Sequence, residues 1–110
     1  MEIKRGDVVV CVALGDYGKP RPAVVVQSDL FNETHASVVV CLITTDLQDA
    51  PLFRVPVSAG KATGLEQESQ VMVEKTIAIP RSKIRDRAGT LSKRELNEVE
   101  AALRLWLGLD

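Results

Sequence analysis

Apolar residues over the first 80 positions of the chain come in short runs separated by polar turn signals. Runs of this length, rich in valine and bounded by Gly, Pro and Asp, are typical of strands in an antiparallel sheet. The fourth run alternates apolar residues with Arg54 and Pro56, which is the period of an edge strand with one exposed face. Leu30 and Phe31 follow the second run, and we expect them to pack back onto the core. The predicted strands are residues 8–14, 23–26, 37–44, 53–57 and 70–75, with Ile77 and Ile79 extending the last one up to Pro80.

The C-terminal region has a different period. Its apolar residues recur every three or four positions, which predicts one amphipathic helix. Ser92 and Glu95 form a capping-box motif before these positions, and Gly108 is suited to ending the helix. Together these elements predict a mainly β fold, a small and strongly curved sheet or barrel with a C-terminal helix laid on it. The positions at helical spacing are Leu96, Val99, Leu103 and Trp106.

Length and composition restrict the possible classes of protein. A chain of 110 residues, 45% apolar and 26% charged, has room for one globular domain, which we expect to span residues 1–110. The longest apolar runs are about seven residues, and the charged N-terminus does not resemble a signal peptide, so we expect a cytoplasmic protein without a membrane span. Fourteen Lys and Arg against fifteen Asp and Glu give a net charge of −1, which argues against nonspecific coating of nucleic acid.

Cys11 and Cys41 each lie inside an apolar run. We expect two buried thiols in a reducing compartment, with a disulfide or a reactive thiol as the alternatives. The cysteines lack the spacing of a metal site, and the single histidine, His35, does not complete a set of four ligands. We therefore expect no metal, and we expect His35 to lie in a loop.

Positive charge is concentrated in one part of the chain. Residues 75–94 carry seven Lys and Arg and one acid, Asp86, whereas residues 95–110 carry four acids and one cation, Arg104. This basic stretch is either a solvated connection that leads into the helix or a footprint for nucleic acid. The sequence leaves both interpretations open.

Five short blocks of residues follow one another in order along nearly the whole chain. They are Arg5-Gly6-Asp7-Val8; Gly18-Lys19-Pro20-Arg21-Pro22 with the valine strand behind it; residues 38–44; Gly64-Leu65 with Glu68-Ser69, Val71 and Glu74; and Gly89-Thr90-Leu91. In this order and spacing the blocks resemble the MazF/PemK (Kid) family of toxins.

The resemblance implies an SH3-like barrel of the CcdB type, a homodimer, and a sequence-specific endoribonuclease that acts on single-stranded RNA without a metal or other cofactor. It also implies a cognate MazE/PemI-like antitoxin that holds the toxin inactive. By match to the family motif, Arg21 corresponds to the catalytic arginine and Thr44 to the catalytic threonine. The further candidates for RNA contact are Lys19, Thr45, Glu74 and Lys75.

The chemistry of RNA cleavage suits these residue types. RNA supplies its own nucleophile, the 2′-hydroxyl, so a site needs only positioning, proton transfer and charge stabilisation. Arg21 offers a fork of donors to the scissile phosphate, and Thr44 adds a hydroxyl donor. The expected products are a 2′,3′-cyclic phosphate and a 5′-hydroxyl. The residues leave the identity of the proton acceptor open.

The sequence departs from the family pattern at two places. Glu74-Lys75-Thr76-Ile77 stands where members often read acid-Gln-x-Arg, and Asp16-Tyr17 stands where some members carry a histidine. These changes bear on the RNA sequence that is cleaved and on whether activity is altered. Lys75 is expected to replace the cation that the missing arginine would supply.

Two other classes of protein have a similar barrel. One is a CcdB-type toxin that traps DNA gyrase and cuts nothing; such a binder has no chemical reason to carry Arg21 and Thr44. The other is a noncatalytic SH3-like module, which normally has an aromatic-lined groove for proline-rich ligands. Only 4% of this chain is aromatic, which makes such a groove a poor explanation.

Overall fold

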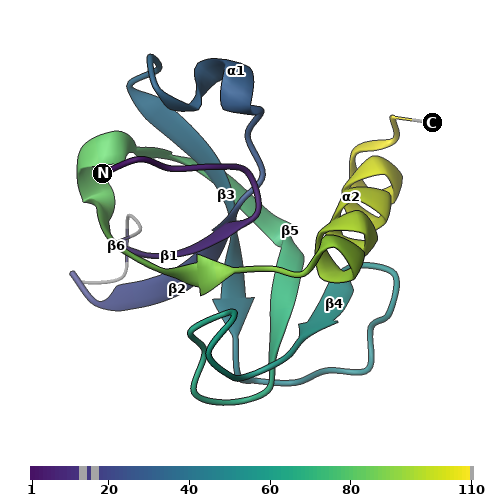
Figure 1. Cartoon of the computed structure of the whole chain (residues 1–110). Helices are drawn as coiled ribbons and strands as arrows, with labels where there is room; N and C mark the ends of the chain where they lie inside the picture. Colours follow the sequence, from purple (N-terminus) through teal and green to yellow (C-terminus); the bar gives the residue numbers. More distant parts are fainter. Residues whose placement is uncertain (13–14, 16–17, 110) are drawn as a thin grey trace.

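The computed structural model describes every residue except 13–14, 16–17 and 110. Within the described residues, six antiparallel strands form one sheet in the order β4-β5-β3-β2-β1-β6, and a C-terminal helix packs against β4 and β5 (Figure 1). The predicted mainly β fold, a small curved barrel with a C-terminal helix, is confirmed. The elements are β1 (Asp7–Val12), β2 (Pro20–Val25), α1 (Asp29–Asn32), β3 (Ser37–Thr44), β4 (Arg54–Val57), β5 (Ser69–Pro80), the 3-10 helix η1 (Arg81–Lys83), β6 (Ile84–Thr90) and α2 (Lys93–Leu107).

The central strands are buried on both faces, and neighbouring residues contribute to two different cores. In β3, Val40 belongs to one core and Cys41 to the other, because successive side chains of a strand point to opposite faces. The core of Cys41 includes Val99 and Ala102 of α2, whereas Cys11 lies in the second core. Both predicted buried thiols are confirmed as buried, and they lie in separate cores.

Most predicted strands are present, with shifted ends. The first is observed over Asp7–Val12, and the predicted residues 13–14 lie outside the described residues. β2 begins three residues earlier than predicted, at Pro20. Its prolines are tolerated because β3 pairs with β2 only from Ala23 onward, so the proline end of β2 is bonded to β1 alone.

One detail of the sequence interpretation is wrong. Leu30 and Phe31 do not pack onto the core: Leu30 is 83% exposed and Phe31 53%. They lie on α1, a four-residue helix that turns Asn32 inward instead, where its amide bonds Gln27 and Asp29. The basic stretch also contains a strand that the sequence did not predict: residues 84–90 form the edge strand β6 on β1, with most of their side chains exposed.

A close approach of two backbones explains how β6 is held. The turn at residues 60–64 lies directly against β6, and Thr90 N–H donates to the carbonyl of Ala62 at 2.8 Å. A Cβ on Gly89 would collide with the Ala62 carbonyl, and one on Gly64 would collide with the Ala88 carbonyl. Glycine is therefore required at both positions.

Helix α2 agrees with its sequence signals. The Ser92 side chain accepts from Glu95 N–H at 3.1 Å, and the Glu95 carboxylate accepts from Ser92 N–H at 2.9 Å, which completes the capping box. Gly108 ends the helix in the left-handed conformation with φ 68°. Near its end, Trp106 packs against Phe53 with ring centroids 5.6 Å apart and the ring planes tilted by 47°. No helix in the described part of the chain has the length and apolar character needed to cross a membrane.

Candidate active site

The site begins with a bulge in β5. Cys41 pairs with Thr76 and Ile43 pairs with Val71, so two steps along β3 correspond to five along β5. Within this bulge the Thr76 hydroxyl donates to the carbonyl of Val73 at 2.7 Å, and it lies 3.2 Å from the Cys41 sulfur. Bulges re-aim side chains next to functional sites. This one contains Glu74 and Lys75, two of the predicted RNA-contact residues.

A polar cavity of about 260 Å³ lies next to the bulge. The ends of β2 and β3, the segment after β3, and strands β4 and β5 all contribute to it. It contains both predicted catalytic residues and one of the four predicted RNA contacts. The lining residues are Arg21, Leu42, Ile43, Thr44, Asp46, Gln48, Arg54, Met72 and Lys75.

Pairing of β2 with β3 explains why Arg21 and Thr44 meet. Ala23 pairs with Leu42, and continuing this register by two residues places Arg21 opposite Thr44. By the alternation of strand side chains, both belong to the face of the sheet that α2 does not cover. Both side chains are partly buried. Two residues 23 positions apart in the sequence thus face one cavity.

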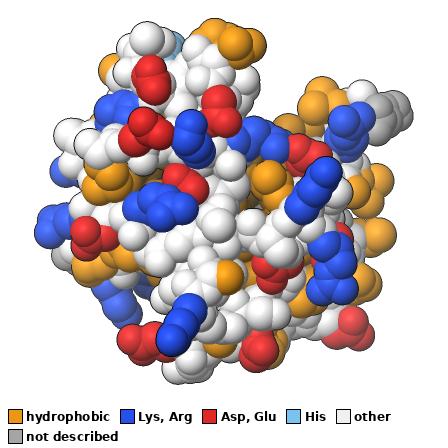
Figure 2. Space-filling model, viewed as in Figure 1, with side chains coloured by type: hydrophobic (Ala, Val, Ile, Leu, Met, Phe, Trp, Pro, Cys, Tyr) orange, Lys and Arg blue, Asp and Glu red, His pale blue; other side chains and the backbone are white. Residues whose placement is uncertain are grey.

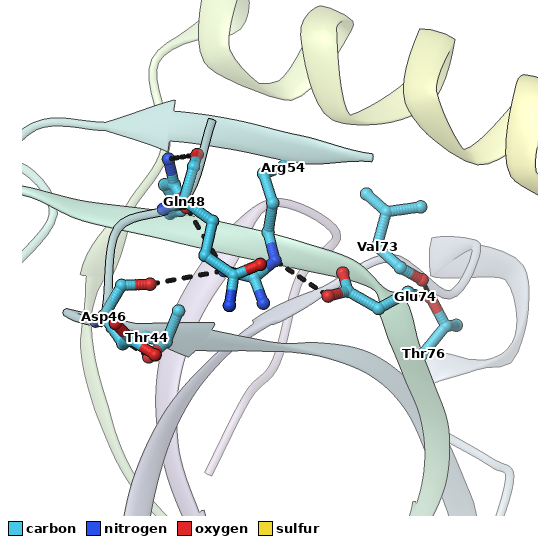
Figure 3. A network of polar contacts seen from close by, with 8 residues as sticks. Thr44, Asp46, Gln48, Arg54, Val73, Glu74 and Thr76 are labelled. Carbon is cyan, nitrogen blue, oxygen red and sulfur yellow. Dashed lines mark hydrogen bonds and ion pairs between the residues drawn. The ribbon is translucent and has the colours of Figure 1, made fainter. Parts of the chain in front are cut away.

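Arg54 is the residue that sequence reasoning misplaced. The alternation in β4 predicts it on the solvent side of an edge strand, yet only 7% of it is exposed. The curvature of the sheet turns this side of β4 toward the bulge, where Arg54 Nε donates to Glu74 Oε2 at 2.8 Å (Figure 3). The other Glu74 oxygen, Oε1, is buried and has no hydrogen-bond partner among the described residues.

The segment that follows β3 is bonded to the same group of residues. Asp46 N–H donates to the Thr44 hydroxyl oxygen at 3.0 Å, and the Asp46 carbonyl accepts from Arg54 Nη1 at 3.3 Å (Figure 3). Gln70 of β5 accepts from Gln48 N–H at 3.0 Å and donates to the Gln48 carbonyl at 2.9 Å. Sequence reasoning missed Asp46, Gln48 and Gln70, because their roles depend on backbone atoms and on strand pairing, which no residue pattern reports.

The remaining predicted RNA contacts occupy different places. Lys75 lines the cavity, and exposed Lys19 directly precedes β2 at the end that carries Arg21. Glu74 lies behind the cavity wall, held by Arg54. Thr45 is not in this cavity; it lines a second one of about 340 Å³ with Pro22. The predicted Asp16-Tyr17 departure lies outside the described residues, and His35 is confirmed in the exposed loop after α1.

The cations of residues 75–94 do not form one patch around the cavity. Only Lys75 lines it, whereas the others lie on η1, on β6 and at the start of α2. Arg87 is paired with Asp7 at 3.1 Å and Arg94 with Glu98 at 3.8 Å. A larger groove of about 500 Å³ lies between α2 and the region of β4, but neither Arg21 nor Thr44 lines it. We therefore place the site at the smaller, polar cavity.

In the described part of the chain no three His, Cys, Asp or Glu side chains gather in a way that would hold a metal ion. The polar residues that line the cavity carry two guanidiniums, a hydroxyl, an ammonium, a carboxylate and an amide, from Arg21, Arg54, Thr44, Lys75, Asp46 and Gln48. Such a set can bind a phosphate diester and donate hydrogen bonds to its oxygens.

Comparison with known proteins identifies the family. Residues 4–107 match the model of the PemK-like, MazF-like toxins of type II toxin–antitoxin systems. The probable endoribonuclease MazF of Mycolicibacterium smegmatis is 40% identical over 108 residues, which cover 97% of this chain and 98% of that protein. Endoribonuclease EndoA of Bacillus subtilis is 31% identical over 114 residues, covering 99% of this chain and 97% of that protein.

Solved structures agree with this assignment. A mycobacterial endoribonuclease in complex with its cognate antitoxin superposes with a TM-score of 0.81 at 25% identity, covering 98% of this chain and 97% of that one. The fold is also that of the Mycobacterium tuberculosis toxin MazF-mt6, with a TM-score of 0.82 at 23% identity over 94% of this chain and 98% of that one. The chain belongs to the PemK/MazF family of toxins of type II toxin–antitoxin systems.

Proposed function

We propose that the Arg21–Thr44 cavity is the catalytic site of an endoribonuclease toxin that cleaves single-stranded RNA at specific sequences. The chain is the toxin of a toxin–antitoxin pair, and its substrate is RNA, messenger RNA above all, met in the cytoplasm. The whole chain, residues 1–110, acts as one toxin domain. The observation that carries the assignment of the site is that Arg21 and Thr44 line the same cavity.

Cleavage follows from what these two residues offer to a phosphate diester. The 2′-hydroxyl loses its proton and attacks the adjacent phosphorus, the bond from phosphorus to the 5′-oxygen breaks, and the 5′-oxygen takes up a proton. Negative charge grows on the oxygens of the phosphate during this step. The Arg21 guanidinium donates to these oxygens in the transition state, and the Thr44 hydroxyl adds a second donor. Since the nucleophile comes from RNA, no metal is needed to generate one. A protein that only binds a partner has no chemical use for this pair.

The neighbouring residues take part in binding the RNA strand. Lys75 lies in the cavity and Lys19 beside it, so both attract the phosphates that flank the scissile bond. Glu74 contributes indirectly, because it is bonded to Arg54 and its other oxygen, Oε1, is buried, so it supports the cavity from behind. Thr45, in the cavity beyond Pro22, contacts the strand farther along. Lys75 in place of the family's usual glutamine changes the sequence that is recognised.

The partners are a second copy of this chain and a MazE/PemI-like antitoxin. Figure 2 shows apolar side chains gathered along the outer side of α2, where Leu105, Trp106 and Leu107 are at least half exposed. A homodimer would cover such a surface. The antitoxin inhibits through an acidic segment that lies over the cavity, because a site that attracts phosphates also attracts carboxylates.

The test is cleavage of a mixed RNA by the purified protein in EDTA, followed by mapping of the ends. We expect cuts at one short sequence, with a 2′,3′-cyclic phosphate on one product and a 5′-hydroxyl on the other. Arg21→Ala should lower kcat about 100- to 1000-fold, by analogy with the loss of an oxyanion donor. The matched control is Arg85→Ala on β6, outside the cavity. A requirement for magnesium, a 5′-phosphate product or an unchanged Arg21→Ala rate would overturn the proposal.

A further inference from the structure

The Thr44 hydroxyl is held in one particular orientation. Its oxygen accepts the Asp46 N–H at 3.0 Å, and a hydroxyl that accepts in this way keeps its own proton for another acceptor. Thr44 lines the cavity, so that proton is available to a ligand there. The direction of the hydroxyl therefore depends on where the Asp46 amide lies.

The backbone of Asp46 is in turn held by Arg54, which is buried, together with Gln70, which is partly buried. Arg54 Nη1 donates to the Asp46 carbonyl at 3.3 Å and to Gln70 Oε1 at 3.2 Å. Gln70 makes two further bonds, both to the backbone of Gln48. Arg54 and Gln70 thus fix the backbone of residues 46–48 by hydrogen bonds. We call this pair of side chains the clamp.

The guanidinium of Arg54 has little freedom to move. Its Nε is bonded to Glu74 Oε2, and the side chain is 7% exposed. Figure 3 shows it lying between Asp46 and Glu74, so one side chain joins the segment after β3 to the bulge in β5. Arg54 also balances the charge of Glu74, which would otherwise stand unpaired beside a site for anions.

We propose that Arg54 is a positioning residue for catalysis: it binds the Asp46 carbonyl and so fixes residue 46, whose N–H donates to the Thr44 hydroxyl and orients it toward the scissile phosphate. The proposal rests on the function proposed above. Nε and Nη1 of Arg54 are bonded to Glu74, Asp46 and Gln70, so these donors hold the protein in place and do not contact the scissile phosphate. Catalytic groups must be held to within about 0.5 Å of their productive positions, and a buried, multiply bonded guanidinium can provide that precision.

A double-mutant cycle tests the proposal. Arg54→Lys keeps the charge but loses the planar fork, and we expect kcat to fall about tenfold with KM within about twofold. Thr44→Val removes the hydroxyl and should cost about 10- to 100-fold. If Arg54 acts through Thr44, Arg54→Lys costs less than about threefold in the Thr44→Val background. Equal losses in both backgrounds would overturn the proposal. Arg94→Lys, on the exposed side of α2, is the control.

Amide hydrogen exchange gives a second measurement that needs no activity. In Arg54→Lys the Asp46 amide should exchange at least about tenfold faster, while amides in the centre of β3 keep their wild-type rates. An unchanged Asp46 amide would overturn the proposal even if kcat fell. Should the wild type cut no RNA, the proposed function fails, and this measurement still decides whether Arg54 holds the segment.

Gln70→Met provides an independent variant in case Arg54→Lys does not fold. It removes the other half of the clamp without leaving a buried charge unpaired. We expect the same faster exchange at Asp46 and a smaller fall in kcat, about threefold. Unchanged exchange and unchanged kcat in Gln70→Met would contradict the role of the clamp.

Discussion

The N-terminus of helix α2 and the floor of the proposed active site are both held by hydrogen bonds of polar side chains, but the bonded partners lie at very different sequence distances. In the capping box, Ser92 and Glu95 are three residues apart and satisfy each other. At the site, Arg54 bonds Glu74 twenty residues away, and Gln70 bonds Gln48 twenty-two residues away. The first arrangement forms wherever the local sequence is helical, whereas the second exists only after β4, β5 and the end of β3 have assembled.

This difference determines how each region responds to a change. Loss of a cap leaves a few backbone donors near the surface, where water replaces the lost bond. Loss of Arg54 leaves a carboxylate enclosed without its counter-ion and releases the Asp46 peptide at the same time. We therefore expect large, coupled effects at the site and small, independent ones at the helix.

The largest effect on stability is expected from Arg54→Met. Removing one partner of a buried ion pair costs about 3–5 kcal/mol of unfolding free energy, because the other charge remains buried and unpaired. The double variant Arg54→Met with Glu74→Met removes both charges and should recover most of this loss. Urea unfolding measures all three proteins. If the unfolding free energy of Arg54→Met lay within about 1 kcal/mol of the wild-type value, the Arg54–Glu74 pair would not be effectively buried.

A smaller effect is expected at the helix from Ser92→Ala. It removes the acceptor for Glu95 N–H and should cost about 1 kcal/mol. Ser82→Ala, at an exposed position on η1, is the control and should be close to neutral. Thermal unfolding followed by circular dichroism measures both. A loss as large as that of Arg54→Met would remove the contrast between the two regions.

The smallest effect is the pH dependence that Glu95 contributes. Burial raises the pKa of this carboxyl, but hydrogen bonds from the backbone of Ser92 and Ser58 outweigh it, and the pKa lies below its usual value. A lowered pKa in the folded state means that the contribution to stability is full above the unfolded-state pKa and is lost as pH falls through the folded-state pKa. The stability difference between wild type and Glu95→Gln should therefore be greatest at neutral pH and shrink in acid. A difference that does not change with pH would contradict this account.

Sequence patterns predicted those parts of the molecule whose partners are close in the chain or whose residues are apolar. The valine-rich strands and α2 with its cap and terminal glycine follow from periodicity and local motifs. Strand β6 was not predicted, because its exposed face carries Arg85 and Arg87 and its pairing comes from β1. Leu30 and Phe31 were placed inside because they are apolar, whereas the short helix α1 turns Asn32 inward.

The proposed active site shows the same division. Family-like blocks singled out Arg21 and Thr44, and strand register brings both to one cavity. Thr45 follows Thr44 in the sequence but lies in the bend beyond the end of β3, and it lines a different cavity. Arg54 alternates with apolar neighbours like an exposed residue, and no local signal indicated that it is buried.

By itself the sequence determined the β-rich fold, the C-terminal helix and the two residues proposed for catalysis, because hydrophobic periodicity, capping and motif identity are local properties. Only the tertiary structure decided what surrounds them. The bulge in β5 aims Glu74 at Arg54, and the curvature of the sheet turns one side of an edge strand into the floor of a cavity. Both depend on contacts between strands distant in the chain, and a buried charge is stable only where such contacts supply its partner.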